Sequence, residues 1–441
     1  MKILPVAVAA ALCLSAACGH PSASTPYVDA SVSSELNQIS AIDNHAHPMA
    51  VVAAGEEDHN YDALSMEGIE DMGLPAPFRE GSPYFPEAWH ALYGVNATAD
   101  GKQNLSRVEQ LSHDMQKRKG DLFPAWVLNQ SHTELMLANR VAMGRGLTPD
   151  RFKWVPFVDM FLFPLNNSAL AAKDPDKKIF FAREQQLLQN YLKDAQLNRV
   201  PAAFDDYLTF VSHRLGTFKS AGAVALKFEL AYLRDLSISD PQRETAERVY
   251  AIYSQSSEPS PEEYKLLQDF LFRYIAREAG RLDLPVHIHC ALGGGSYFRE
   301  ANADPLLLEP LFNDPGLRKT KFVLLHGGYP FTREAAALIL KPNVYLDYSA
   351  FMYLNYPVEG ARAVRLYLES APEKVLYGSD ASPFTNNVGW AETDWIGAHL
   401  AREELGIALT GMMHDGEITL DRAKQIGHLV LRENARQLYG F

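Results

Sequence analysis

The chain is poor in cysteine, in clustered basic residues and in long apolar runs. Its three cysteines are Cys13, Cys18 and Cys290, and the first two lie in an N-terminal segment that we expect to be removed or modified. The mature chain can then form no intramolecular disulfide, so its stability must come from a packed core. The formal net charge is −13, with no run of lysines or arginines. Nucleic acid is therefore excluded as a partner, because phosphate binding needs a basic patch.

Two common hydrolase signatures are also missing. The sequence has no Gly-x-Ser-x-Gly elbow, and Cys290 has no evident base partner. Both serine and cysteine hydrolases are disfavoured for this reason.

The N-terminus has the pattern of a targeting segment. Lys2 is followed by an apolar stretch, residues 3–18, that is too short to span a bilayer. The small residues before Cys18 look like a bacterial lipoprotein cleavage site, and an ordinary secretory signal cut nearby is the alternative. We expect a signal peptide over residues 1–18, a polar tether over residues 19–38, and export to the bacterial periplasm. Membrane contact would then come only through a lipid anchor.

The bulk composition predicts one large domain. The chain has 441 residues, of which 47% are hydrophobic and 22% charged, as in ordinary globular proteins. A (β/α)8 barrel needs about 250 residues and tolerates long insertions. We therefore expect one barrel domain over residues 39–441.

Eight short apolar segments predict the strands of this barrel. They show little alternation, as expected for strands that are buried on both faces. The segments are ISAID, TELMLAN, KWVPFVD, GAVALKF, PVHIHC, KFVLLH, NVYLDYS and KVLYGS.

Amphipathic helices are predicted between the later strands. The clearest covers residues 260–279, where Ser260 is the N-cap, Pro261 the first helical residue and Glu263 the partner in a capping box. We expect Gly280 to end this helix. Strands that alternate with helices indicate an α/β fold with a parallel sheet, a (β/α)8 TIM barrel.

Two connections are much longer than the others. Residues 48–131 separate the first two strands, and residues 160–221 separate the third from the fourth. Both leave the C-terminal ends of strands, where the active sites of such barrels lie. We therefore interpret them as lid insertions and pocket walls that carry specificity.

Residues able to bind a metal occur at the ends of several predicted strands. In a closed barrel these ends converge on one mouth, so residues distant in sequence become one site. Side chains two residues apart on an extended segment point the same way, which lets His45 and His47 bind one cation with Ala46 turned away. The residues at these strand ends are His45, His47, Lys227, His289, His326 and Asp380.

This order of residues resembles the amidohydrolase superfamily. The stretch from LPVHIHC through VLLHGGYPFTREAA to VLYGSDAS resembles its amidohydrolase-related branch, also called amidohydrolase 2. Within that branch the chain is most similar to the amidohydrolase-type domain fused to glutamine-synthetase-like proteins. CALGGGSYF and SPFTNN depart from the pattern that we expect in two loops of the pocket. The identity of the substrate therefore does not carry over.

The resemblance implies a zinc centre with one or two ions. In the one-metal mode the ligands would be His45, His47, His289 and Asp380, with His326 facing the substrate. In the two-metal mode His45, His47 and Asp380 would hold one ion, His289 and His326 the other, and a carboxylated Lys227 would bridge them. Glu229 could serve in place of Lys227, and Lys227 could instead contact a substrate carboxylate.

The resulting functional hypothesis is a metal-dependent amidohydrolase that cleaves an amide bond with metal-activated water. Asp380 and His326 are its catalytic candidates. Tyr232 and Arg234 are candidates for binding a small substrate that bears a carboxylate, although a salt bridge at the barrel rim explains Arg234 as well. The alternatives are a lactone or ester hydrolase, a non-oxidative decarboxylase of the same superfamily, and a binding scaffold without activity. An oligomer is compatible with the sequence.

Overall fold

The computed structural model describes residues 27–441, except for residues 54, 71–72, 74, 76, 78, 80–81, 96–101, 255–257 and 385–387; the side chains of residues 102–106 are also left out. The predicted signal peptide and Cys18 lie outside the described residues. Within them, no helix combines the length and the apolar character needed to cross a bilayer.

The strands are short, parallel and buried. They coincide with the eight predicted segments, with boundaries shifted by a few residues. The strands are β1 (Ala41–Ala46), β2 (Thr133–Asn139), β3 (Phe152–Val155), β4 (Leu226–Phe228), β5 (Val286–His289), β6 (Phe322–Leu325), β7 (Val344–Asp347) and β8 (Val375–Leu376).

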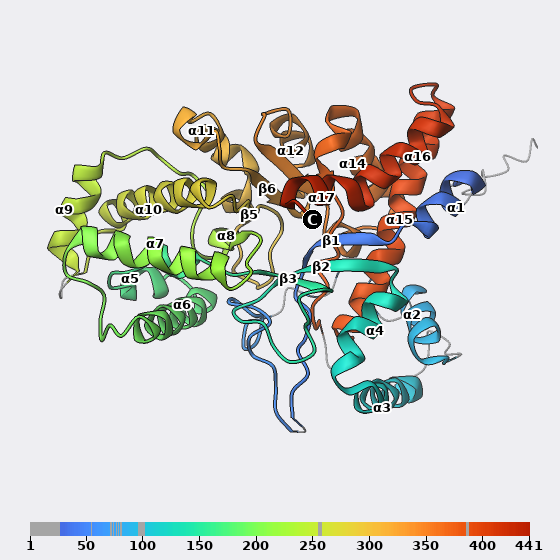
Figure 1. Cartoon of the computed structure of the whole chain (residues 1–441), viewed down its shortest axis with the longest axis horizontal. Helices are drawn as coiled ribbons and strands as arrows, with labels where there is room; N and C mark the ends of the chain where they lie inside the picture. The colour runs from blue at the N-terminus through green and yellow to red at the C-terminus, as the bar shows by residue number, and fades with distance from the viewer. Residues whose placement is uncertain are drawn as a thin grey trace, which may run out of the picture.

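Helices surround the strands, as Figure 1 shows. The helices of the first half are α1 (Ala30–Gln38), α2 (Tyr84–Tyr93), α3 (Lys102–Lys119), α4 (Phe123–Gln130), α5 (Ser168–Ala171), α6 (Pro175–Asp194), α7 (Phe204–Ser220) and α8 (Leu230–Leu233). Those of the second half are α9 (Arg243–Tyr253), α10 (Pro261–Arg281), α11 (Glu309–Phe312), α12 (Thr332–Leu338), α13 (Phe351–Leu354), α14 (Pro357–Ser370), α15 (Trp390–His414), α16 (Leu420–His428) and α17 (Asn434–Tyr439).

The strands follow one another around a ring. Continuous parallel pairing gives the orders β1-β2-β3 and β4-β5-β6-β7-β8. Backbone hydrogen bonds cross both seams between these two groups. At the β3/β4 seam the Lys227 amide donates to the Pro156 carbonyl at 2.9 Å, and at the β8/β1 seam the Asn44 amide donates to the Tyr377 carbonyl at 2.8 Å. The α/β fold with the strand order of a TIM barrel is therefore confirmed.

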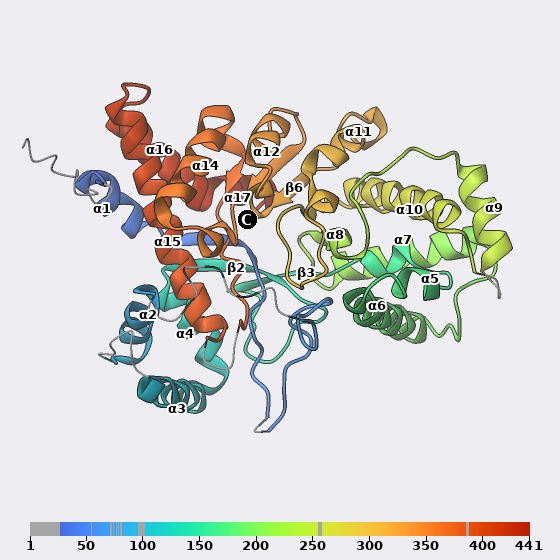
Figure 2. The same ribbon diagram turned by 180° about the vertical axis from the view of Figure 1, so that it is seen from behind.

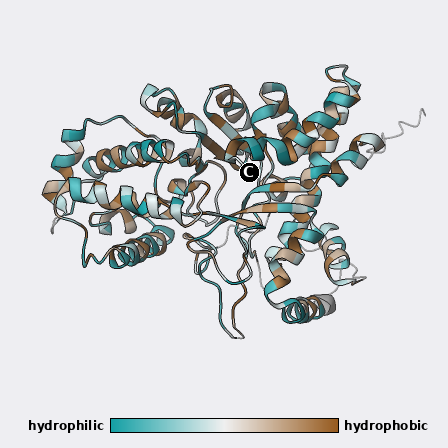
Figure 3. Ribbon diagram, viewed as in Figure 1, coloured by the Kyte–Doolittle hydropathy of each residue, from teal (hydrophilic) through white to brown (hydrophobic). Residues whose placement is uncertain are grey.

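The inside of the ring is filled by apolar side chains, and the C-terminal helix packs against them. Ala435 and Leu438 of α17 belong to the same buried cluster as Ile42, Leu135 and Val323 from the strands. Figure 3 shows hydrophobic colour along the strands and mixed bands on the outer helices. The interior is a packed core, which leaves the strand ends as the place for a site.

The two long connections form helical groups on opposite sides of the barrel (Figures 1 and 2). Residues 48–131 carry α2, α3 and α4, of which α2 and α4 pack against α15. Residues 160–221 carry α5, α6 and α7, and α7 packs against α10. Their action as lids stays a prediction.

Two local expectations were wrong. Residues 30–38, predicted as part of a polar tether, form α1, because Val32 and Leu36 make an apolar stripe that is buried against α15 and α16. Asp29 caps this helix by accepting from the amides of Ser31 and Val32. In addition, Gly280 does not end α10 but lies inside it, where a β-carbon would come within 2.6 Å of the hydroxyl of Thr320.

Candidate functional site

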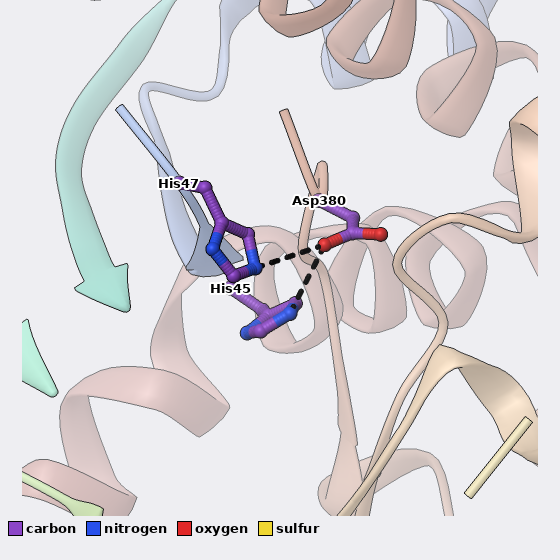
Figure 4. A group of neighbouring side chains, drawn as sticks. All are labelled: His45, His47 and Asp380. Atoms are coloured by element: carbon purple, nitrogen blue, oxygen red, sulfur yellow. Dashed lines mark ion pairs between the residues drawn. The ribbon is translucent and has the colours of Figure 1, made fainter. Parts of the chain in front are cut away.

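The ends of β1 and β8 bring three of the predicted ligands together. The Nε2 atom of His45 lies 3.1 Å from Oδ1 of Asp380, and Nε2 of His47 lies 3.5 Å from the same oxygen. Figure 4 shows both imidazoles pointing toward this carboxylate. Each residue offers a ligand atom, and these atoms lie within 4.8 Å of one another. The alternation of side chains along β1 produces this arrangement, as predicted for His45 and His47.

Two of the site residues have an unusual backbone conformation. Asp380 has φ of 55° and His326 has φ of 63°. These left-handed values are uncommon for residues other than glycine and cluster at functional sites. Both residues follow a strand, so the chain changes direction at each of them.

The other predicted residues lie around this cluster. The rings of His45 and His326 have centroids 5.0 Å apart, and those of His326 and His289 are 4.7 Å apart. Lys227 is buried, with its Nζ atom 3.4 Å from Nε2 of His45. The Tyr232 ring lies 4.8 Å from the ring of His289. His289 and Lys227 are thus neighbours of the three-residue cluster and not members of it.

Arg234 does not point to this site, and the expectation that it binds a substrate carboxylate was wrong. Its Nη2 atom donates to Oδ1 of the buried Asp269 at 2.5 Å, and Nη1 donates to the Ser237 carbonyl at 3.2 Å. The guanidinium is therefore used in a structural ion pair, as in the salt-bridge alternative.

The structure also adds residues that the sequence did not single out. Asp62 of the first long connection lies 3.6 Å from Nδ1 of His47, and Glu184 lies buried in α6 of the second. Neither follows a strand, so no pattern marks it. Asp347 does end a predicted strand, and that position is the signal that could have found it.

Burial keeps several of the imidazoles uncharged. Burial and, second, Lys227 together lower the pKa of His45 to about 3, against the effect of Asp380. Burial also lowers the pKa of His289 to about 3 and holds that of His326 well below its ordinary value. These three rings therefore carry free lone pairs at neutral pH, as metal ligands must.

At His47 and Asp380 the charged neighbours outweigh burial in setting the pKa. Burial lowers the pKa of His47, but Asp62 and Asp380 raise it above its ordinary value. Burial raises the pKa of Asp380, yet the facing rings of His326, His45 and His47 hold it well below its usual range. Asp380 is therefore an anion at neutral pH.

A chain of hydrogen bonds fixes the tautomer of His326. The Ser349 hydroxyl donates to Oδ1 of Asp347, which also accepts from the Ser349 amide at 2.9 Å. Nδ1 of His326 lies 2.9 Å from the same hydroxyl. Because the single hydroxyl proton goes to the carboxylate, Nδ1 must be the donor in this contact. Nε2 of His326 then keeps a lone pair, which suits a metal ligand or a base.

The donor set fits a divalent metal ion. Two imidazoles and an ionised carboxylate form the first cluster, and such nitrogen and oxygen ligands suit zinc once His47 has released its extra proton. His47 also has an outer partner, since Nδ1 lies 3.1 Å from the Tyr61 carbonyl. Outer partners of this kind orient metal-binding histidines.

Comparisons with known proteins identify relatives of part of the chain. Residues 255–441 match the amidohydrolase family, so the resemblance predicted from the motifs is confirmed over the part that carries His289, His326 and Asp380. The curated relative "Protein fluG" from Emericella nidulans is 27% identical over 228 residues, which are 49% of this chain. The match spans 25% of the length of fluG.

Solved structures share the fold over almost the whole chain. A protein from Lactobacillus casei described as a metal-dependent hydrolase has a TM-score of 0.63 at 18% identity, covering 93% of this chain and 97% of that one. A uronate isomerase from Thermotoga maritima has a TM-score of 0.58 at 12% identity, covering 92% and 96%. A glucuronate isomerase from Caulobacter crescentus has a TM-score of 0.56 at 13% identity, covering 93% of each. Such likeness establishes the architecture.

Proposed function

We propose that the protein is a metal-dependent hydrolase that cleaves an amide bond of a small molecule with water activated at His45, His47 and Asp380. The observation that carries the proposal is the convergence of these three ligand atoms within 4.8 Å at adjoining strand ends. A metal ion held there would supply a Lewis acid and lower the pKa of water toward ~7.

Asp380 is the proton acceptor in this proposal. Its carboxylate is ionised, and its Oδ2 lies 3.9 Å from Nδ1 of His326 while Oδ1 faces the two histidines of β1. A carboxylate in this position can orient a water molecule, take its proton and deliver that proton to the leaving nitrogen.

His326 is a base or a ligand rather than a hydrogen-bond donor, because its Nε2 atom holds a lone pair. It can stabilise a developing oxyanion only after it has accepted a proton. Lys227 offers a buried amine 3.4 Å from Nε2 of His45 and can donate to that oxygen.

Tyr232 is a substrate contact in this proposal. Its hydroxyl accepts from the Gly294 amide at 3.3 Å, and its own proton remains free to donate. Burial, the largest cause, raises the pKa of this hydroxyl well above its ordinary value, so the proton is retained.

Metal analysis of the purified chain, followed by a substrate panel, tests the proposal. We expect zinc to co-purify and His45→Ala to lose it. Amides should be hydrolysed faster than esters, lactones, uronates and carboxylic acids prone to decarboxylation. Unchanged metal content in His45→Ala would refute the site. Isomerisation of uronates or loss of carbon dioxide without hydrolysis would refute the reaction and leave the site standing.

The location and the nature of the substrate are further proposals. We propose export to the periplasm with a lipid anchor at Cys18, and a small substrate that bears a carboxylate. Mass spectrometry of mature protein from its native host checks the first point, and a retained Met1 would contradict it.

A further inference from the structure

A second group of acidic side chains lies beside His47, on the side away from Asp380. It consists of Asp62, Asp159, Glu184 and Glu229, which we call the carboxylate pocket. Three of its members are buried, with 1% of Asp159, 2% of Glu184 and 5% of Glu229 exposed. Asp62 comes from the first long connection and Glu184 from the second, so both insertions contribute to the pocket.

Several oxygens of this pocket have no hydrogen-bond partner among the described residues. They are both carboxylate oxygens of Glu184, Oε2 of Glu229 and Oδ1 of Asp159. Asp159 is partly satisfied, because its Oδ2 accepts from the Glu229 amide at 2.9 Å. A buried carboxylate without a partner is costly unless a proton or a cation compensates it.

The charges in the pocket do not balance. Lys227 acts on Asp159 and on Glu229, and its Nζ atom lies 4.0 Å from Oε1 of Glu229. Four carboxylates against one ammonium leave three negative charges when all groups are ionised. One divalent cation would remove most of this excess.

The geometry provides ligands for such a cation. His47, Asp62 and Glu229 each offer a ligand atom, and these atoms lie within 4.8 Å of one another. Nε2 of His47 faces Asp380, whereas Nδ1 lies 3.6 Å from Oδ2 of Asp62 and 3.1 Å from the Tyr61 carbonyl. Nδ1 can therefore bind a cation of the pocket only after it gives up its hydrogen bond to Tyr61. His47 therefore stands between the first cluster and the carboxylate pocket.

We propose that the carboxylate pocket is a second divalent-cation site. Its ligands are Asp62, Glu229 and His47, and Glu184 and Asp159 are buried acidic neighbours that add negative charge. It differs from the second site that the resemblance implies at His289, His326 and a carboxylated Lys227. Its oxygen-rich donors suit a hard cation such as Mn²⁺. The site does not depend on which bond the enzyme cleaves.

The two sites are coupled through His47. A neutral imidazole has one lone pair, so His47 serves one ion at a time unless it loses its second ring proton. Binding at one site must therefore change the affinity of the other, and the change must be reciprocal.

Titration of the metal-free full chain with Mn²⁺, read by electron paramagnetic resonance and elemental analysis, tests the proposal. We expect Asp62→Asn and Glu229→Gln each to bind one equivalent fewer than the wild type, while Asp380→Asn keeps the pocket's ion with altered affinity. Glu404→Gln is the matched control, because Glu404 is also buried with both oxygens unpartnered but lies in α15. It should bind as many ions as the wild type.

The outcomes separate the two proposals. If Asp62→Asn and Glu229→Gln keep the full metal content and affinity, and only Asp380→Asn loses an ion, the pocket is refuted and the proposed function stands. If Glu229→Gln loses the only bound ion and Asp380→Asn keeps it, the pocket is supported and the first site is refuted. Asp62 is partly exposed, so Asp62→Asn remains informative if a variant at a buried position does not fold.

Discussion

Replacement of Ser349 by alanine removes the hydroxyl that joins His326 to Asp347. Both hydrogen bonds of this hydroxyl are buried. Loss of them leaves Nδ1 of His326 without its partner, while Oδ1 of Asp347 keeps the backbone amide of residue 349 as a donor at 2.9 Å. The free energy of unfolding should fall by about 1–3 kcal/mol. His326 would then be free to adopt either tautomer.

The effect on the site should be similar in size to the effect on the fold. Outer partners of metal-site histidines typically contribute a factor of about 10–100 in metal affinity or activity. This range corresponds to about 1.4–2.7 kcal/mol, since tenfold equals about 1.36 kcal/mol. We expect Ser349→Ala to lower kcat by such a factor with little change in KM, because the ring keeps its place but loses its fixed protonation.

The assay combines steady-state kinetics with ¹⁵N chemical shifts of the His326 ring, which distinguish the two tautomers. Ser131→Ala is the control, because Ser131 is also buried and hydrogen-bonded but lies at the C-terminal end of α4, before β2. It should lose stability and keep its kcat. If Ser349→Ala has unchanged kcat and an unchanged His326 tautomer, the argument from the hydrogen-bond chain is wrong.

Three further results are expected. Arg234→Ala should lower stability by about 1–3 kcal/mol in urea unfolding, because the buried Asp269 loses one charged donor while Lys265 and Ser239 still donate to it, and should leave KM unchanged; a raised KM with unchanged stability would restore a role in substrate binding. Burial raises the pKa of Asp394 to about 7 from 3.8, so its contribution to stability is fully present below about pH 4 and is lost as the pH rises through about 7. Asp394→Asn should therefore raise the Tm at pH 8 and not at pH 4, and an equal effect at both would contradict the burial argument. Lys227→Ala should lose about one metal equivalent, partly rescued in activity by short carboxylic acids, if Lys227 is a carboxylated bridge; unchanged metal content with a raised KM would make it a substrate contact.

The sequence predicted the parts of the site that follow local rules. Buried parallel strands read as continuous apolar runs, and this pattern located all eight strands of the ring. The residues that follow such runs come together in any closed barrel, which is why His45, His47 and Asp380 could be named before their distances were known. Ser260 was likewise correct as the cap of α10, with its hydroxyl accepting from the Glu263 amide at 3.2 Å.

The sequence did not reveal contacts between distant loops. Asp62 and Glu184 sit in the two long connections, where no periodicity relates a side chain to the barrel axis, so their approach to His47 and Glu229 was not predictable. The prediction that Arg234 binds a substrate carboxylate was wrong for a related reason. Its position near a strand end pointed to the mouth, but the choice between a substrate and Asp269 depends on how α10 packs.

The sequence by itself therefore determined the class of fold and the residues at the strand ends. Buried parallel strands are visible as short apolar runs, and the residues that follow these runs converge when such strands close into a barrel. Only the tertiary structure decided the partners of these residues. The tautomer of His326, the ion pair of Arg234 and the negative charge collected beside His47 all depend on burial and on distances of a few ångströms between segments far apart in the chain. Those quantities arise from packing, which no local pattern encodes.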